Sequence, residues 1–235
     1  MQPAPPTLEN TRAILFDFGD TLASLSPTKE ELFIQAAASL GVELSLPVVR
    51  RAYQIVDFHN KYSSVNVKDR ADFYRSYNEQ LCEAIGISSH FDDLQPRLVE
   101  HFKEHKSWQL FEDVLPVLSL IQQKGIPLGL VANWDRDLPE LTERLGIKQY
   151  FATIVSSQEA GVEKPDPAIF ESALRKLSLP VGNDRVLYVG NEYRADVMGA
   201  RSAGLTPILI DRTELYANAD CRRYPTLRQW SEAMS

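Results

Sequence analysis

The sequence has the composition of an ordinary globular protein. It has 235 residues, of which 44% are hydrophobic and 24% charged, which is enough for a sizeable buried core. The formal net charge of −7 argues against nucleic acid as the main partner, and an anionic substrate would need a local cation to offset it. No apolar run approaches the roughly 20 residues of a membrane-spanning helix, so no membrane partner is expected.

The start of the chain and its cysteines bear on location. Residues 1–11 read MQPAPPTLENT, without the basic and apolar regions of a signal peptide, and we predict a flexible N-terminal tail. Cys82 and Cys221 match no metal-binding spacing and are too few for a disulfide framework. The simplest expectation is a cytoplasmic protein.

The first predicted strand ends in a carboxylate. Residues 14–22 read ILFDFGDTL, an apolar run followed by Asp17, a glycine turn and a hydroxyl residue. Such a run suits a buried strand, and ligands bind at the carboxyl ends of strands in open α/β sheets. Asp17 is therefore a candidate nucleophile or metal ligand, and the alternative is a loop aspartate that caps the next helix.

The next part of the chain, residues 27 to about 106, carries helical periods and no convincing strand signal. Capping residues, prolines and glycines mark the helix ends. We predict four helices, which begin near Ser26 or Thr28, near Ser45 and Pro47, at residue 69 and at residue 91. This block, residues 24–107, is predicted to be a helical cap inserted after the first strand.

From about residue 108 strands and helices alternate, which predicts a parallel sheet with helices on both faces. The predicted strands cover residues 127–132, 151–155, 186–189 and 206–210, and the predicted helices cover 116–123, 138–145, 167–177 and 195–203. The fold class is therefore α/β: a three-layer Rossmann-like core of residues 12–23 and 108–235, with a mostly parallel sheet of five or six strands, plus the inserted cap.

Polar residues follow four of the predicted strands, at 17–21, 133–135, 164–166 and 191–196. The carboxyl ends of parallel strands meet at one edge of a sheet, so we expect Asp17, Lys164 and Asp196 to converge there, facing the cap. Two alternatives stay open: Lys164 as a solvent-facing loop residue, and Asp196 as a helix-start aspartate that satisfies backbone amides.

The ordered set of motifs resembles the haloacid dehalogenase-like hydrolase superfamily, subfamily I with a helical C1 cap. The resemblance covers about residues 12–212. It rests on the strand followed by Asp-x-x-x-Thr, on Glu-Lys-Pro-Asp-Pro at 163–167, and on Gly190 with Asp196 six residues later. It implies a Mg2+-dependent phosphatase of small phosphomonoesters that forms an aspartyl-phosphate.

The resemblance also implies a role for each matching residue. Asp17 would be the nucleophile, Lys164 the neutralising cation that also contacts the phosphate, and Thr21 the organiser of the loop at the substrate. The metal would be held by Asp17, the backbone carbonyl of Gly19, and the fourth motif, here Asn191 and Asp196. Positive charge at these points suits phosphoryl transfer, which depends on positioning and charge neutralisation.

Three positions depart from the family pattern. Gly19 replaces the aspartate that acts as general acid-base, Ala132 replaces a serine or threonine that binds the phosphate, and Asn191 replaces an aspartate. A lost general acid costs about 10²- to 10⁴-fold in rate, and a neutral amide weakens a magnesium site. Asp20 is a candidate substitute for the missing catalytic carboxylate, as is Glu192, and Asn133 offers an amide donor beside Ala132.

Two further groups of residues carry weaker predictions. His101 and His105 have metal-binding spacing on a predicted helix, but their charged neighbours favour a solvated face. Five aromatic residues could line a substrate pocket, although their helical spacing favours packing within the cap. They are Phe58, Tyr62, Phe73, Tyr74 and Tyr77.

Two other functions compete with the phosphatase. One is metal-independent hydrolysis of the dehalogenase type, which Gly19 and Asn191 favour and which would need a cap arginine. The candidates are Arg50, Arg51, Arg70 and Arg75. The other is a non-catalytic protein that keeps the fold and binds a ligand or partner. Substrate identity and oligomeric state cannot be predicted from the sequence.

Overall fold

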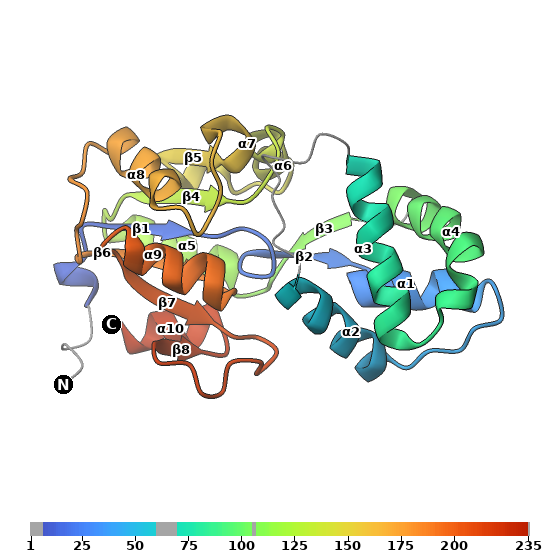
Figure 1. Cartoon of the computed structure of the whole chain (residues 1–235). Helices are drawn as coiled ribbons and strands as arrows, with labels where there is room; N and C mark the ends of the chain where they lie inside the picture. Colours follow the sequence, from blue (N-terminus) through green and yellow to red (C-terminus); the bar gives the residue numbers. More distant parts are fainter. Residues whose placement is uncertain (1–6, 60–69, 105–106, 235) are drawn as a thin grey trace. The chain divides into compact units, whose positions relative to one another are not determined.

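The structure, a computed structural model, describes residues 7–59, 70–104 and 107–234, and within this part the side chains of 57–59 and 70 are not described. The chain divides into two compact units, which are described separately (Figure 1). The core unit comprises the described residues of Met1–Ser24 and Leu110–Ser235. The helical unit comprises those of Leu25–Gln109.

The core unit contains a six-stranded sheet in the order β5-β4-β1-β6-β7-β8, and every adjacent pair is parallel. The strands are β1 (Ala13–Phe16), β4 (Leu128–Ala132), β5 (Thr153–Ser156), β6 (Val186–Gly190), β7 (Thr206–Ile210) and β8 (Arg222–Tyr224). The predicted mostly parallel sheet is confirmed. The edge strand β8 was not predicted, because three polar residues give no period to recognise.

Helices cover both faces of this sheet (Figure 1). They are α5 (Val114–Gln123), α6 (Leu138–Arg144), α7 (Ser157–Ala160), α8 (Pro167–Lys176), α9 (Gly199–Ser202) and α10 (Leu227–Ala233). A π-helix (Tyr193–Met198) precedes α9, where the sequence predicted one continuous α-helix over 195–203. Short 3-10 turns lie at Leu8–Asn10 and Lys148–Tyr150.

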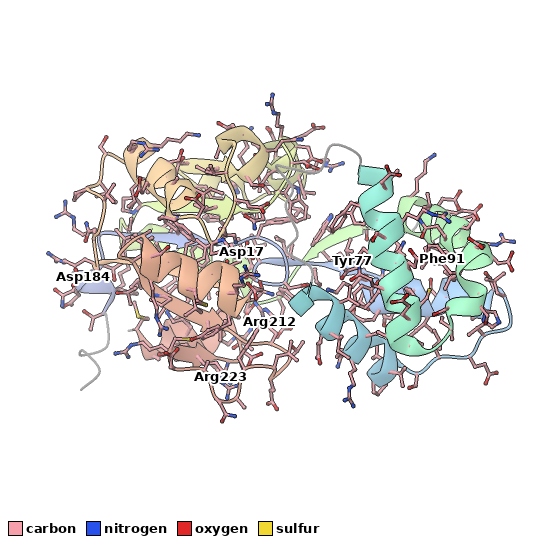
Figure 2. All side chains as sticks on the ribbon, viewed as in Figure 1. Asp17, Tyr77, Phe91, Asp184, Arg212 and Arg223 are labelled. Atoms are coloured by element: carbon pink, nitrogen blue, oxygen red, sulfur yellow. The ribbon has the colours of Figure 1, made fainter. Side chains whose placement is uncertain are left out.

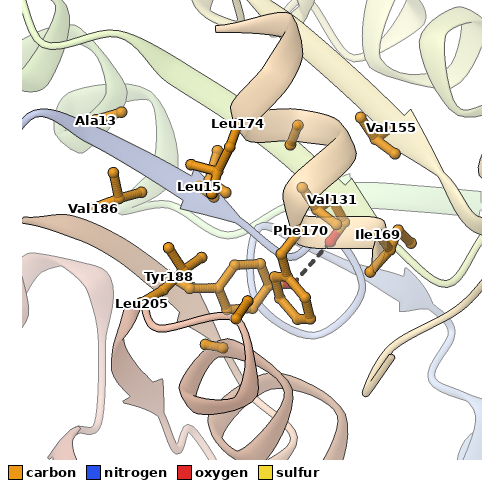
Figure 3. Close-up of a cluster of buried hydrophobic side chains, with 13 residues drawn as sticks. Ala13, Leu15, Val131, Val155, Ile169, Phe170, Leu174, Val186, Tyr188 and Leu205 are labelled. Atoms are coloured by element: carbon orange, nitrogen blue, oxygen red, sulfur yellow. Dashed lines mark hydrogen bonds between the residues drawn. The ribbon is translucent and has the colours of Figure 1, made fainter. Parts of the chain in front are cut away.

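The alternation of side chains along β1 assigns the two faces. Ala13 and Leu15 pack in a buried cluster with residues of α8 and α9 (Figure 3). Phe16 points the other way and packs edge-to-face on Trp230 of α10, with ring centroids 5.8 Å apart. All four residues of β1 are buried between these two layers, so the strand is a firm base for the residue that follows it.

The N-terminal segment differs from the predicted free tail over residues 1–11. Leu8 is buried, and its N–H donates to the Met234 carbonyl at 3.3 Å. The described part of this segment is therefore fastened to the end of the core unit, and residues 1–6 lie outside the described residues.

The helical unit contains α1 (Lys29–Ala38), α2 (Leu46–His59), α3 (Arg70–Ile85), a 3-10 turn (Ser88–His90) and α4 (Phe91–Glu104). Thr28 caps α1 through a capping box with Glu31, which satisfies two backbone donors at the helix start. The helices share their own buried cluster around Phe33, Tyr53 and Leu81. Between residues 27 and 104, no strand is present in the described part.

Two short strands, β2 (Ala23–Ser26) and β3 (Ser107–Leu110), pair with each other where the chain crosses between the units. The sequence did not predict them, since four residues are too few for a clear alternation. None of the helices that the structure describes is both long and apolar enough to cross a membrane.

Candidate active site

Asp17 lies directly after β1 at the carboxyl edge of the sheet. Its N–H donates to the Val189 carbonyl at 2.8 Å and so extends the pairing with β6 by one residue. The residue is 7% exposed. Figure 2 shows it at the opposite end of the core unit from Asp184, which precedes β6. The predicted placement at a strand end is therefore observed.

The loop after Asp17 is a tight turn. The N–H groups of Leu22 and Ala23 both donate to the Phe18 carbonyl, at 2.9 and 3.1 Å. Asp20 closes the turn with a left-handed φ of 53°, a conformation that aspartate tolerates better than most residues, and it is exposed. The Thr21 hydroxyl points back and donates to Asp17 Oδ2 at 3.2 Å.

Lys164 reaches Asp17 from the loop between α7 and α8. It lies eight residues beyond the end of β5, whereas the sequence predicted a position at the strand end. Its Nζ lies 2.6 Å from Asp17 Oδ1 and 2.7 Å from Asp196 Oδ1. Its side chain is 3% exposed, so the solvent-facing alternative is wrong. A buried ammonium of this kind needs such partners, because an unpaired buried charge is very costly.

Asn133 fixes the backbone of that lysine. Its Oδ1 accepts from the Lys164 N–H at 2.7 Å and its Nδ2 donates to the Lys164 carbonyl at 3.0 Å. The Asn133 side chain therefore orients Lys164. Ala132 ends β4 as a buried methyl group and offers no hydroxyl.

Asp196 serves two purposes within the π-helix. Its Oδ2 accepts from the Glu192 N–H at 2.8 Å, as a helix-start aspartate would, while its Oδ1 pairs with Lys164. The carboxylate lies so close to Gly190 that a Cβ at that position would overlap it. The last residue of β6 must therefore be a glycine for Asp196 to reach the lysine.

Glu192 is committed to a local role. Its carboxylate accepts from the Ala195 N–H and caps the π-helix. Burial raises the pKa of Glu192, against the lowering effect of these backbone N–H groups. Glu192 was a candidate to replace the missing carboxylate, but its side chain is bound to the start of the π-helix.

Tyr188 is a member of the site that the sequence did not predict. It lies on β6, fully buried, and its hydroxyl accepts from Lys164 Nζ at 2.8 Å. Its own proton can go to the Val131 carbonyl at 2.8 Å, drawn in Figure 3, or to Asp196 Oδ1 at 3.2 Å. The available signal was a tyrosine inside an aliphatic strand, since a buried hydroxyl requires a partner.

Burial and ion pairing compete in the electrostatics of the cluster. Burial raises the pKa of Asp17 to about 6 despite the opposing effect of Lys164. Burial alone would lower the pKa of Lys164, but Asp17 and Asp196 raise it overall, so the ammonium stays charged. Burial also raises the pKa of Tyr188 well above its ordinary value, so the phenol stays neutral. Two carboxylates then face one ammonium, and the charged cluster is net negative.

The fit of a magnesium ion can be judged at Asn191. Turned one way, its amide nitrogen donates to Gly19 O at 3.0 Å, Asp17 Oδ2 at 3.2 Å and Thr21 Oγ1 at 3.3 Å. Turned the other way, its oxygen faces the carbonyl and the carboxylate, an arrangement that a cation stabilises. Carboxylate, carbonyl and amide oxygens are ligands that Mg2+ accepts, so Asp17, Gly19 and Asn191 fit the ion.

Asp196, the fourth predicted metal ligand, has Lys164 on one oxygen and a backbone N–H on the other. Across the described residues, no group of three or more His, Cys, Asp or Glu side chains could hold a metal. Any metal here would depend on the backbone carbonyl of Gly19 and the amide of Asn191.

The other candidates lie in the helical unit. Phe73 stacks on Tyr77 with centroids 5.9 Å apart, and Tyr77 also contacts Tyr53. Arg75 pairs with Asp92 at 3.3 Å, and its guanidinium lies over the ring of Phe91, which Figure 2 labels together with Tyr77. Arg50 and Arg51 are exposed on α2, and His101 is partly buried on α4. Tyr62 and His105 lie outside the described residues, as do the side chains of Phe58 and Arg70.

Comparisons with known proteins agree with this architecture. A family model for hydrolases, described as haloacid dehalogenase-like hydrolase, matches residues 11–204. Haloacid dehalogenase-like hydrolase domain-containing protein 3 of Danio rerio is 28% identical over 210 residues, 86% of each chain. A glyceraldehyde 3-phosphate phosphatase of Methanopyrus kandleri is 30% identical over 216 residues, 86% of this chain and 84% of that protein.

A solved structure shows the same fold. The HAD-hydrolase YfnB of Bacillus subtilis, bound to magnesium, matches with a TM-score of 0.69. The match covers 95% of this chain and 98% of that chain at 18% identity. At this level of identity the match shows that the two chains share a fold.

Proposed function

The chain belongs to the haloacid dehalogenase-like hydrolase family, and from this premise we propose that it hydrolyses small phosphomonoesters with Asp17 as nucleophile. The single observation that carries the proposal is the buried Asp17 carboxylate, held at 2.6 Å from the Lys164 ammonium at the carboxyl edge of the sheet. Two phosphatases, of glyceraldehyde 3-phosphate and of phosphoserine, are among the relatives at 30% identity.

The reaction would proceed in two balanced steps. An Asp17 oxygen attacks phosphorus, the bond from phosphorus to the ester oxygen breaks, and the leaving alkoxide takes a proton from water, which leaves hydroxide. Water then attacks the aspartyl-phosphate at phosphorus, the bond from phosphorus to the Asp17 oxygen breaks, and the hydroxide takes the proton that the attacking water loses. Inorganic phosphate and the Asp17 carboxylate are the products. Lys164 neutralises charge near the attacking carboxylate, and Thr21 holds Oδ2 in place.

Magnesium is part of this proposal. Asp17, Gly19 and Asn191 would hold the ion, which supplies positive charge to the phosphoryl oxygens when bound. The missing negative charge at Asn191 makes the site a weak one. The net negative charge of the Asp17, Asp196 and Lys164 cluster supports a cation as its complement.

The helical unit is proposed to be the cap that selects the substrate. It is inserted between β1 and β4, directly after the loop that carries the nucleophile. We place the protein in the cytoplasm, where small phosphate esters are available, as the composition suggests. A fractionation of cells that express the tagged chain would test this placement.

The decisive experiment is a phosphatase screen on a diverse phosphomonoester panel, with and without Mg2+, for the wild type, Asp17→Asn and Asp184→Asn. Asp184 is an exposed carboxylate at the other end of the core unit and provides the matched control. We expect Mg2+-dependent turnover that Asp17→Asn abolishes and Asp184→Asn leaves unchanged. Turnover that survives in Asp17→Asn would refute the proposal.

A second candidate, a binding protein without turnover, is favoured by one observation. With its nitrogen turned inward, Asn191 satisfies Gly19, Asp17 and Thr21 without any metal. This candidate predicts no release of phosphate across the whole panel, with or without Mg2+. Saturable binding of a phosphate ester in the absence of turnover would then establish it.

A further inference from the structure

The side chain and the backbone of Thr21 are held by different partners. The hydroxyl of Thr21 donates to Asp17 Oδ2 at 3.2 Å, while its carbonyl accepts from Arg212 Nη2 at 3.0 Å. Arg212 follows β7 and is separated from Thr21 by 191 residues of sequence. A distant guanidinium therefore reaches the loop that fixes the nucleophile, and Figure 2 labels both Asp17 and Arg212 in this part of the core unit.

The guanidinium of Arg212 has a fixed position. Its Nη2 and Nη1 contact Asp113 Oδ1 and Oδ2 at 2.9 and 3.2 Å, a two-pronged pair, and its Cζ lies 3.8 Å from the centroid of the Phe111 ring. The Arg212 side chain is 15% exposed. A planar guanidinium that is both paired with a carboxylate and stacked on a ring loses most of its rotational freedom. A lysine ammonium could not make the same two-pronged, stacked contact.

Asp113 is fixed in turn. Its side chain is 4% exposed, and its Oδ2 also accepts from the N–H groups of Leu227 and Arg228 at the start of α10, at 2.8 and 3.4 Å. The ion pair thus joins the start of α5, the end of β7 and the start of α10. Because α10 packs through Trp230 on Phe16 of β1, the guanidinium is anchored to the strand that precedes Asp17.

The neighbouring residue of the loop is held in the same way. The Phe111 N–H donates to the Leu22 carbonyl at 3.1 Å, while the Phe111 ring supports Arg212. Two successive carbonyls, those of Thr21 and Leu22, are therefore bound by one assembly. Both of these hydrogen bonds go to backbone carbonyls of the loop, so the assembly can set the position of Asp17 through the loop backbone.

We propose that Arg212 is a positioning residue that holds the loop after Asp17 in its attacking conformation through the Thr21 carbonyl. This inference rests on the proposed function of Asp17. Small displacements of a reacting group cost about 10- to 100-fold in rate even when the change lies away from the chemistry. Loss of the Arg212 contact should therefore lower kcat with little change in KM.

The test compares Arg212→Met, Arg212→Lys and the control Arg223→Met. Arg223 also pairs with a buried carboxylate, that of Asp211 at 2.8 Å, although its own side chain is 33% exposed. Asp211 binds the N–H groups of Leu215 and Tyr216 instead of the Asp17 loop. We expect Arg212→Met to lower kcat on an aryl phosphate about 10- to 100-fold with KM within about 3-fold. Arg212→Lys should have an intermediate kcat, and Arg223→Met should keep the wild-type kcat even where it lowers the melting temperature.

Hydrogen exchange provides the readout that does not depend on activity. The Leu22 and Ala23 amides should lose protection in Arg212→Met but not in Arg223→Met. If the wild type turns over and Arg212→Met keeps its kcat, or if Arg223→Met loses as much, the inference is wrong. If the wild type has no turnover, the proposed function fails, and hydrogen exchange alone then tests whether Arg212 positions the loop. Unchanged protection of the Leu22 and Ala23 amides in Arg212→Met would overturn the inference. Lost protection would support it. Should Arg212→Met not fold, Arg212→Lys carries the same comparison.

Discussion

At the scale of single residues, Gly19 is the most consequential departure from the family pattern. In the proposed reaction Gly19 offers no carboxylate, and the leaving oxygen takes its proton from water. We predict that Gly19→Asp raises turnover of alkyl phosphates by up to about 10²- to 10⁴-fold, since their leaving groups need a proton. Aryl phosphates, with leaving groups of low pKa, should change far less. The ratio of kcat/KM for the two substrate types measures this, and an equal gain for both would contradict it.

Asp17 itself should reduce the stability of the metal-free protein. Its pKa is raised to about 6 in the folded state, above the ordinary 3.8, so the folded state binds the proton more tightly. The resulting stabilisation is complete below pH 3.8 and is lost as the pH rises through about 6. Asp17→Asn, which stays neutral, should therefore gain stability relative to the wild type as the pH rises from 4 to 7.5.

The measurement is urea unfolding of both proteins from pH 4 to 8 without divalent ions. The difference should shrink towards pH 4, where Asp17 is largely protonated. Asp184→Asn controls for the loss of a surface carboxylate and should show no such trend. A difference between Asp17→Asn and the wild type that is independent of pH would show that burial does not control this carboxylate.

At the scale of elements, β6 contributes more to the site than its sequence pattern suggested. Its Tyr188 hydroxyl links Lys164 to the Val131 carbonyl of β4. Tyr188→Phe leaves one N–H of Lys164 and one buried carbonyl without this partner, so we predict a loss of about 1–3 kcal/mol in unfolding free energy. We also expect a lower kcat, because the lysine is less firmly placed.

Tyr150→Phe is the matched control for that prediction. Tyr150 shares a single hydrogen bond with Ser119, 3.0 Å long, and makes no contact with Lys164 among the hydrogen bonds of the described residues. Loss of this hydrogen bond in Tyr150→Phe should lower the unfolding free energy by less than Tyr188→Phe does, and it should leave kcat unchanged. If Tyr188→Phe keeps wild-type kcat, the hydroxyl is only structural.

The elements also show what sequence can and cannot predict. The strands β4 and β6 were predictable because each is a short, mainly apolar run, and all five of its residues are buried in the parallel sheet. The meeting of Asp17 and Lys164 at one sheet edge was expected from the parallel order. The contact between Arg212 and Thr21 was not, since nothing in either segment indicates a partner 191 positions away. The role of the Tyr188 hydroxyl was not predicted either, because the residue lies in a buried strand whose sequence does not indicate Lys164 as a partner.

At the scale of the whole molecule, each unit has its own hydrophobic cluster, and all proposed metal ligands belong to the core unit. A ligand stabilises only the structure whose unfolding would release it. We predict that Mg2+ raises hydrogen-exchange protection around β1 and β6 but not in α1 or α4. In Asn191→Asp the same protection should appear at a lower Mg2+ concentration. Equal protection of both units, or of neither, would argue against this metal site.

In the proposed reaction, the contacts of Lys164 have a consequence for how phosphate leaves. An ammonium group carries three protons, and here Asp17, Asp196 and Tyr188 accept all three, at 2.6, 2.7 and 2.8 Å. An arriving anion can accept a hydrogen bond from Lys164 only if the lysine gives up one of these three existing hydrogen bonds. Inorganic phosphate, which has no further groups for recognition, gains little from that exchange. We therefore expect weak inhibition by inorganic phosphate, because the three hydrogen bonds of Lys164 form again when phosphate dissociates.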